Sequence, residues 1–173
     1  MRRVGDRVPR VTFSLRRDGT WLERTSDDIF NGRTVVVLAV PGAFASICSS
    51  SHLPGYVALS KNIRMMGVDE ICCLSVNDAF VMNAWARDQG IEDEVAMLPD
   101  GNGRFTREMG MLVSRTQLGF GERSWRYSML VHDGVIGKIF VEDRNHGLDR
   151  VAVSDAITML DHLDNSAPAA ANG

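Results

Sequence analysis

The sequence predicts an α/β domain in which helices flank a central mixed β-sheet and a β-hairpin is added at the N-terminal end. Two observations lead to this fold class. Residues 34–40, Thr-Val-Val-Val-Leu-Ala-Val, form the continuous β-branched run typical of a central strand that is covered on both faces. Strand-like and helix-like patterns then alternate along the chain, and a second hairpin and a closing helix follow them.

The first half of the chain supplies the N-terminal hairpin and the first helix after the central strand. Residues 11–15 alternate like a strand, and Asp18-Gly19 is a turn signal. After residue 40, apolar residues recur at helical spacing over 49–66. Pro54-Gly55 is expected to kink or break that helix near its start.

The middle of the chain continues the alternation. A strand is predicted over 68–76, and Asn77 or Asp78 can cap a helix that ends near Gly90. A third strand is predicted over 95–98. The expected apolar face of the helix consists of Phe80, Val81, Ala84 and Trp85.

The second half closes the fold. A short helix is expected over 105–109, and an antiparallel hairpin over 127–131 and 135–141 turns at Asp133-Gly134. Ser154 is expected to cap the last helix, with its apolar face formed by Ala156, Ile157, Leu160 and Leu163. This order of elements is that of a thioredoxin-like fold.

Length and charge narrow the possible functions. The 173 residues predict one domain over 1–164 and a disordered tail over 165–173, which is rich in Ala, Pro, Asn and Gly. A net charge of -3 with mixed signs argues against nucleic acid or an anionic membrane as the main partner. Since the sequence shows neither a signal peptide nor a membrane span, a cytoplasmic location is expected.

Three cysteines, Cys48, Cys72 and Cys73, fit neither a disulfide framework nor a metal site, because their number is odd and no Cys-x-x-Cys spacing occurs. Of the three, Cys48 is the one whose sequence position indicates a reactive thiol. It follows the central strand and stands at the start of a predicted helix, where unpaired N–H groups and the helix dipole favour a thiolate.

The segment around Cys48, residues 41–55, reads Pro-Gly-Ala-Phe-Ala-Ser-Ile-Cys-Ser-Ser-Ser-His-Leu-Pro-Gly. It resembles the active-site loop of the Prx5-type peroxiredoxins, with the pattern Pro-Gly-Ala-Phe-Thr-Pro-x-Cys-Ser followed by His-Leu-Pro-Gly. Residues 74–80 and 126–129 also fit that subfamily, and the similarity runs over roughly residues 3 to 163. Through residues 99–103 and 119–126, the chain looks most like the peroxiredoxin half of bacterial hybrid proteins that carry a glutaredoxin domain.

The resemblance implies a role for several residues. Cys48 would be the peroxidatic cysteine, which attacks the peroxide O–O bond and becomes a sulfenic acid. Arg126 would stabilise the thiolate and the transition state, and Pro41 would shield the site from water. Backbone N–H groups of Ile47 and Cys48 would hold the peroxide oxygens. Further candidate substrate-binding positions are Phe44, Ala45 and Phe120.

One departure from the family pattern concerns a substrate donor. The family Thr that hydrogen-bonds the peroxide is Ala45 here, and the following position, usually Pro, is Ser46. By analogy with the loss of one oxyanion-hole donor, the deficit is about 2.7–4 kcal/mol, or roughly a hundredfold to a thousandfold in rate. Ser46 is a partial substitute only if its hydroxyl is aimed in the same direction.

The second departure concerns resolution of the sulfenic acid, because the sequence has no cysteine after Cys73. Cys73 matches a cysteine common in the subfamily, and we interpret it as a buried core residue. Cys72 is expected on the opposite strand face and is also interpreted as structural. The predicted cycle is therefore of the one-cysteine type, in which glutathione and a separate glutaredoxin reduce Cys48 through a mixed disulfide.

Other readings remain open at this level. His52, four residues after Cys48, would share a helix face with it, as in a cysteine hydrolase, although no orienting third residue is evident. Trp85 and Phe120 also fit core or interface packing, and His132 fits an exposed turn.

The sequence and the resemblance together predict a thiol peroxidase that reduces hydrogen peroxide and small alkyl hydroperoxides without metal or bound cofactor, and the resemblance implies a homodimer. A low-activity redox sensor or binding module on the same fold is the alternative, because Ala45 removes a substrate donor.

Overall fold

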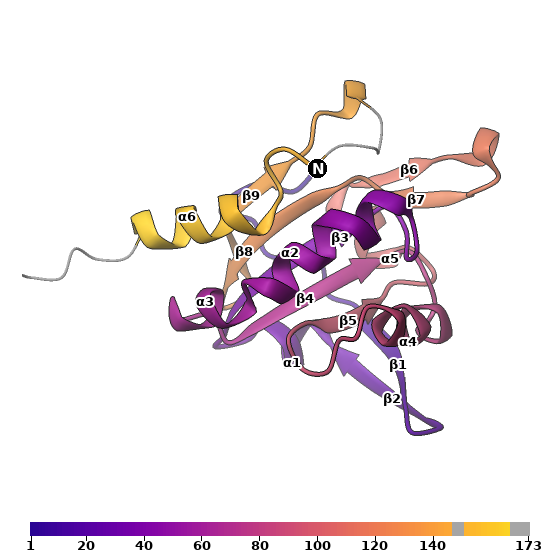
Figure 1. Cartoon of the computed structure of the whole chain (residues 1–173), viewed down its shortest axis with the longest axis horizontal. Helices are drawn as coiled ribbons and strands as arrows, with labels where there is room; N and C mark the ends of the chain where they lie inside the picture. Colours follow the sequence, from indigo (N-terminus) through magenta and orange to yellow (C-terminus); the bar gives the residue numbers. More distant parts are fainter. Residues whose placement is uncertain (147–150, 167–173) are drawn as a thin grey trace, which may run out of the picture.

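The computed structural model describes residues 1–146 and 151–166 and has a five-stranded sheet at its centre (Figure 1). The strand order is β5-β4-β3-β8-β9. β3 pairs in parallel with β4, which pairs in parallel with β5, whereas β8 is antiparallel to both β3 and β9. The predicted mixed sheet is therefore confirmed, with strands β3 (Thr34–Val40), β4 (Glu70–Ser75), β5 (Ala96–Pro99), β8 (Tyr127–His132) and β9 (Val135–Val141).

Two hairpins lie outside this sheet. The predicted N-terminal hairpin is formed by β1 (Thr12–Arg17) and β2 (Thr20–Thr25). A second hairpin pairs β6 (Leu112–Ser114) with β7 (Glu122–Ser124). Sequence reasoning missed it because strands of three residues are too short to show alternation. Figure 1 shows it projecting beyond the central sheet.

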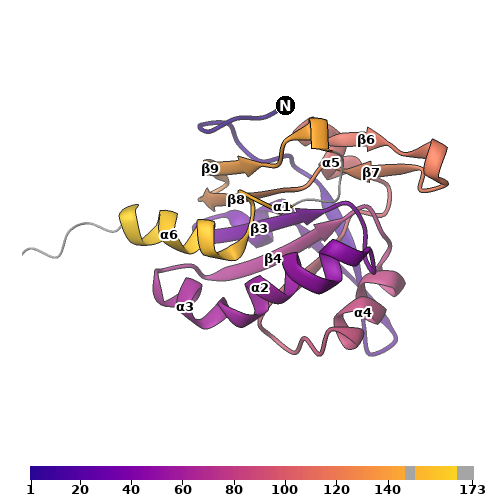
Figure 2. The ribbon, with the colours of Figure 1, turned by 45° about the horizontal axis from the view of Figure 1, so that its top comes forward.

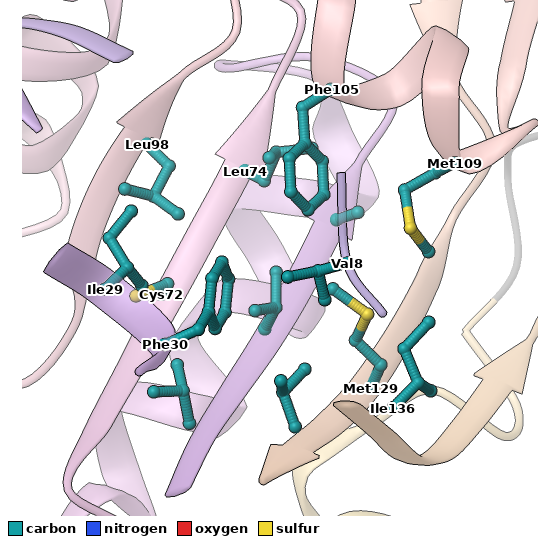
Figure 3. Packing of buried hydrophobic residues seen from close by; sticks show 14 of the residues in the cluster. Val8, Ile29, Phe30, Cys72, Leu74, Leu98, Phe105, Met109, Met129 and Ile136 are labelled. Atoms are coloured by element: carbon teal, nitrogen blue, oxygen red, sulfur yellow. The ribbon is translucent and has the colours of Figure 1, made fainter. Parts of the chain in front are cut away.

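Helices and the N-terminal segment cover the two faces of the sheet. On one face, Val8, α1 (Ser26–Phe30) and α5 (Arg104–Met109) pack against Cys72, Leu74 and Met129, as Figure 3 shows, and β1 joins the same cluster. The other face is covered by α2 (Leu53–Ala58), α3 (Ser60–Met65), α4 (Ala79–Asp88) and α6 (Ala156–Ser166). In Figure 2, α2 and α3 run along β4, with α6 beside them. Six of the seven residues of β3 are consequently buried.

The helix after Cys48 breaks at a different place from the one predicted. A π-helical turn, η1 (Cys48–His52), leads directly into α2, and Pro54 lies in the first turn of α2. The N–H of Leu53 reaches back five residues to the Cys48 carbonyl, and this wider turn accommodates the proline ring. The interruption comes instead at Leu59, between α2 and α3, where φ is -97° and ψ is 7°.

The buried face of α4 differs in part from the prediction. Asp78 caps the helix by accepting the N–H of Val81, which decides between the two candidate caps. Trp85 is buried as expected, but Ala79 and Met82 complete the core face. Phe80 is 57% exposed and packs edge-on against Trp21 of the N-terminal hairpin.

The last helix also begins differently. Asp155 rather than Ser154 is its cap, because the Asp155 carboxylate accepts the N–H of Thr158 at 2.9 Å. Met159 occupies the core position that was expected for Ile157, which is 64% exposed. Asn165 and Ser166, which were expected in the tail, are helical.

The remainder of that predicted tail, residues 167–173, lies outside the described residues. Within the described parts of the chain, every helix is too short or too polar to cross a lipid bilayer.

Candidate active site

Strand register places the end of β3, the start of β8 and the end of β9 side by side at one end of the sheet. Ala39 of β3 stands opposite Tyr127 of β8, which in turn stands opposite Val141 of β9. Arg126 directly precedes β8, and its carbonyl accepts the N–H of Glu142 at 3.1 Å. Since β3 ends at the same edge, the loop that carries Cys48 begins beside Arg126.

The sulfur of Cys48 and the guanidinium of Arg126 are in contact. Arg126 Nη2 donates to Cys48 Sγ at 3.4 Å across 78 residues of sequence. Both side chains are buried, with exposed fractions of 0% for Cys48 and 2% for Arg126. Because a guanidinium keeps its charge and water is excluded, this contact favours negative charge on the sulfur. The predicted partnership of these two residues is present in the geometry.

The backbone next to the sulfur forms the first turn of a helix. Ser46 and Ile47 are helical, and the first helical bond runs from the Ser49 N–H to the Ala45 carbonyl at 3.0 Å. The N–H groups of Ile47 and Cys48 therefore precede the point at which intrahelical acceptors become available. Both N–H groups lie at the positive end of the helix, where they can bind an oxygen that gains charge.

A pocket of about 300 Å³ lies over this turn. Phe44 and Phe120, each about half exposed, contribute apolar walls, and Arg126 connects the pocket to the buried sulfur. Cys48 itself has no exposed surface, so a peroxide reaches Sγ only when lining side chains move. The pocket is lined by Pro41, Gly42, Ala43, Phe44, Ala45, Ser46, Ile47, Asn77, Phe120, Arg123 and Arg126.

Asn77 holds the loop that shapes this pocket. Its side-chain oxygen accepts the N–H of Ala43 at 3.0 Å and the hydroxyl of Ser75 at 2.6 Å. The next loop residue, Phe44, has a φ of 62°, in the left-handed region that is unfavourable for a bulky side chain. The hydrogen bonds of Asn77 stabilise the loop next to this strained residue. The sequence predicted Asn77 as a candidate helix cap and as part of the 74–80 motif, but not as a residue that holds this loop.

His52 is oriented by Arg126 rather than by Cys48. Arg126 Nη1 lies 3.0 Å from His52 Nδ1, and because a guanidinium can only donate, Nδ1 must be the unprotonated acceptor. His52 Nε2 consequently carries the proton and donates to the Ser154 carbonyl at 3.0 Å. Burial, with the Arg126 charge, lowers the pKa of His52 to about 4.

This geometry argues against the cysteine hydrolase reading. A base for Cys48 would need a free lone pair directed at the sulfur, whereas the lone pair of Nδ1 is directed at Arg126.

Comparison with known proteins identifies the family of this chain. A protein-family model described as Redoxin matches residues 3–160. The chain is 52% identical over 159 residues to the hybrid peroxiredoxin hyPrx5 of Haemophilus influenzae, and the match covers 92% of this chain and 65% of that protein. It is 51% identical over 170 residues to peroxiredoxin sll1621 of Synechocystis sp., covering 91% of this chain and 89% of that one. The chain belongs to the peroxiredoxin family.

A solved structure extends the comparison to three dimensions. Reduced Prx3 of Vibrio vulnificus, in complex with hydrogen peroxide, is 39% identical with a TM-score of 0.87. The match covers 95% of this chain and 97% of that chain. The thioredoxin-like fold is thereby confirmed for this peroxiredoxin.

The position of the family Thr offers the substrate no side-chain donor in this peroxiredoxin. Ala45 is exposed and precedes the first helical turn. Ser46 is exposed as well and belongs to that turn, one residue further along. Because side chains of adjacent residues leave the backbone in different directions, Ser46 does not place a hydroxyl where a residue-45 hydroxyl would stand.

The two neighbouring cysteines of β4 lie on opposite faces of the sheet, as predicted. Cys72 packs with the α1 and α5 face, and Cys73 packs in the cluster that contains Cys48. Burial raises the pKa of both thiols, so neither is a ready nucleophile in the folded protein. Trp85 donates its indole N–H to Ser49 at 2.8 Å, next to Cys48.

Sequence reasoning missed Arg123 and Glu142. Arg123 lines the pocket and donates to the Glu122 carbonyl, while Glu142 holds the segment before α6. No local pattern distinguishes Arg123, inside β7, or Glu142, directly after β9, from ordinary charged residues. His132 is exposed, as predicted, and its Nδ1 pairs with Thr34 Oγ1.

Neutral His52 predicts an acid-sensitive fold. Because the folded pKa lies near 4 and the unfolded value near 6.5, the unfolded chain binds the extra proton between these values. The free energy of unfolding should then fall as pH is lowered through this window, by up to about 1.4 kcal/mol per pH unit. Urea unfolding between pH 4.5 and 7 measures this slope, and His52→Asn should reduce it.

His162 supplies the control for this measurement. Its pKa is lowered by desolvation and by Lys138 and His132, so it titrates in the same direction. Because His162 is much less buried, His162→Asn should leave most of the slope in place. An unchanged slope in His52→Asn would contradict the assignment.

Proposed function

We propose that this protein is a thiol peroxidase that reduces hydrogen peroxide and small alkyl hydroperoxides at Cys48. The observation that carries the proposal is the buried contact between Arg126 and Cys48 Sγ beside the first turn of a helix. One relative, Prx3 of Vibrio vulnificus, was solved with hydrogen peroxide bound, which supports the substrate class. The chain spans 65% of the length of the Haemophilus protein that it matches.

In the first step, the Cys48 thiolate attacks one oxygen of the peroxide. An S–O bond forms as the O–O bond breaks, and the other oxygen leaves with the electron pair of that bond. This oxygen takes a proton and departs as water or an alcohol, and Cys48 is left as a sulfenic acid. Negative charge therefore moves from sulfur to the leaving oxygen.

The proposed site stabilises this charge at both ends. Arg126 faces the sulfur, and the N–H groups of Ile47 and Cys48 are available for the peroxide oxygens. Pro41 lines the pocket, where its apolar ring would limit the access of water to the sulfur. Because Ala45 offers no hydroxyl, these groups supply the stabilisation without the Thr donor of the family pattern.

We further propose that the sulfenic acid is reduced by glutathione with a separate glutaredoxin. The first thiol would form a mixed disulfide with Cys48 and release water, and a second thiol would release Cys48 and leave a disulfide as product. Burial raises the pKa of Cys73, and the Arg126 guanidinium donates to Cys48 rather than to Cys73, which supports this one-cysteine cycle. All three cysteines are free thiols in the structure, which suits a reducing compartment such as the cytoplasm.

A homodimer is the proposed assembly. Phe44, Leu118 and Phe120 are all half-exposed or more, and Phe44 and Phe120 line the same pocket. Large apolar side chains gathered at one exposed place commonly mark an interface. A second copy of the chain that covers this patch would also dry the mouth of the pocket.

Peroxide consumption with glutathione and glutaredoxin tests the function. Cys48→Ser should abolish turnover, because the nucleophile is lost. Ala45→Thr should raise the rate of Cys48 oxidation by roughly a hundredfold to a thousandfold, because it restores one donor to the transition state. Ala58→Thr makes the same substitution at an exposed position of α2 outside the pocket lining, so it is the matched control and should leave the rate within about twofold.

The outcome separates two candidate functions. Cys48-dependent turnover in the unmodified protein supports the peroxidase. If only Ala45→Thr turns over, the chain is a redox sensor on the same fold, and if neither does, the mechanism is wrong.

The one-cysteine cycle makes a separate prediction. Cys73→Ala should leave steady-state turnover with glutathione and glutaredoxin within about twofold, because the buried thiol takes no part in resolution. Cys72→Ala, on the opposite face of the sheet, is the control for packing effects. Detection by mass spectrometry of a Cys48–Cys73 disulfide after one equivalent of peroxide would refute this cycle.

The dimer can be tested without changing the pocket. Leu118 is 58% exposed and lies outside the pocket lining, so Leu118→Glu should produce a monomer by placing charge in an apolar interface. Sedimentation equilibrium measures the mass. Met65→Glu, at an 83% exposed position on α3, should leave the dimer intact, and a dimeric Leu118→Glu would contradict the proposed patch.

A further inference from the structure

The carboxylate of Glu142 lies at the centre of a compact hydrogen-bond cluster. Its Oε1 accepts the N–H groups of Ala152, Val153 and Ser154 at 2.9, 2.9 and 2.8 Å. The Ser154 hydroxyl donates to the same oxygen at 2.8 Å. Four donors converge on one oxygen, which fixes the segment that leads into α6.

Glu142 is ionised, and its negative charge strengthens the four hydrogen bonds that it accepts. Burial raises the pKa of the Glu142 carboxyl, but the N–H groups and the Ser154 hydroxyl lower it by more, so the pKa lies below its ordinary value. Glu142 is therefore a carboxylate at neutral pH. A carboxylate accepts such bonds more strongly than a neutral group does.

The segment held by Glu142 presents a carbonyl to the active site. The Ser154 carbonyl accepts His52 Nε2 at 3.0 Å and the hydroxyl of Tyr56 at 2.9 Å. His52 in turn accepts Arg126 through Nδ1 at 3.0 Å, and Arg126 donates to Cys48 Sγ at 3.4 Å. A continuous path of contacts therefore leads from Glu142 to the reactive sulfur.

The tautomer of His52 decides whether the ring can accept a hydrogen bond from Arg126. With the proton on Nε2, the lone pair of Nδ1 is directed at Arg126. If the Ser154 carbonyl moved away, the Nδ1–H tautomer would become accessible, and an N–H would then face the N–H groups of the guanidinium. Two facing donors repel, which would turn Arg126 away from Cys48.

We propose that Glu142 is a positioning residue for the peroxidase reaction, which acts through the Ser154 carbonyl and the His52 tautomer to keep the Arg126 guanidinium on Cys48. This inference rests on the proposed function of Cys48 and Arg126. Glu142 contacts neither peroxide nor sulfur. Its effect is on the direction in which Arg126 donates.

The test measures two quantities, the rate of Cys48 oxidation and the tautomer of His52. Stopped-flow tryptophan fluorescence, to which Trp85 contributes through an indole bonded to Ser49 beside Cys48, should report the oxidation of Cys48 by hydrogen peroxide. Glu142→Ala should slow this step by roughly tenfold to a hundredfold, by analogy with metal ligands that lose the hydrogen-bond partner orienting them. Glu142→Gln keeps one carbonyl oxygen at the centre of the cluster and should recover most of the rate.

Long-range ¹H–¹⁵N NMR of the His52 ring measures which nitrogen carries the proton. A general loss of stability in Glu142→Ala would not by itself change this tautomer. The unmodified protein should show the Nε2–H tautomer, and Glu142→Ala should show a mixture that includes Nδ1–H. Because this readout needs no turnover, it decides the inference even if the protein proves inactive with peroxide. Failure of the proposed function and failure of the inference are thus distinguishable.

Tyr56→Phe is the matched control, because it removes the other bond to the same Ser154 carbonyl but leaves the path to Arg126 intact. Its oxidation rate should stay within about threefold of the unmodified protein, with the His52 tautomer unchanged. The proposal is overturned if Glu142→Ala keeps the Nε2–H tautomer, or if Tyr56→Phe slows oxidation as much as Glu142→Ala does.

Discussion

A buried positive charge is the constraint on which the rest of the site depends. The guanidinium of Arg126 is almost fully removed from water, and a cation in that position is costly unless its N–H groups find acceptors. Cys48 Sγ and His52 Nδ1 are two of these acceptors. The same electrostatic requirement therefore favours a negative sulfur and a neutral histidine.

The neutral His52 in turn requires a hydrogen-bond acceptor for its second ring nitrogen. Since Nδ1 accepts, Nε2 must donate, and the Ser154 carbonyl is the group that receives it. That carbonyl belongs to a segment before α6, so the closing helix contributes to the site without supplying a reactive group. Glu142 fixes the segment from the neighbouring strand end. Each partner in this series is buried or half-buried, which makes the arrangement rigid.

The sheet supplies the alignment that these contacts need. β3 lies between β4 and β8, so the loop after β3 is flanked by Asn77 on one side and by Arg126 on the other. Asn77 holds the loop near Ala43, and Arg126 holds the sulfur. The strained backbone of Phe44 lies between these two supports, at the mouth of the pocket. A one-residue slip of β8 against β3 would turn Arg126 to the opposite face.

The sequence by itself determined the mixed α/β fold, the central strand and the setting of Cys48 at a helix start, because these features follow from local periodicity and short motifs. Arg126 came from its motif and not from periodicity. Only the tertiary structure decided that His52 serves Arg126, that Asn77 holds the loop and that Glu142 joins the site. Those contacts depend on strand register and on which helix face is buried, as the exposure of Phe80 and Ile157 shows. A single sequence carries no local signal for either, since both result from packing between distant segments.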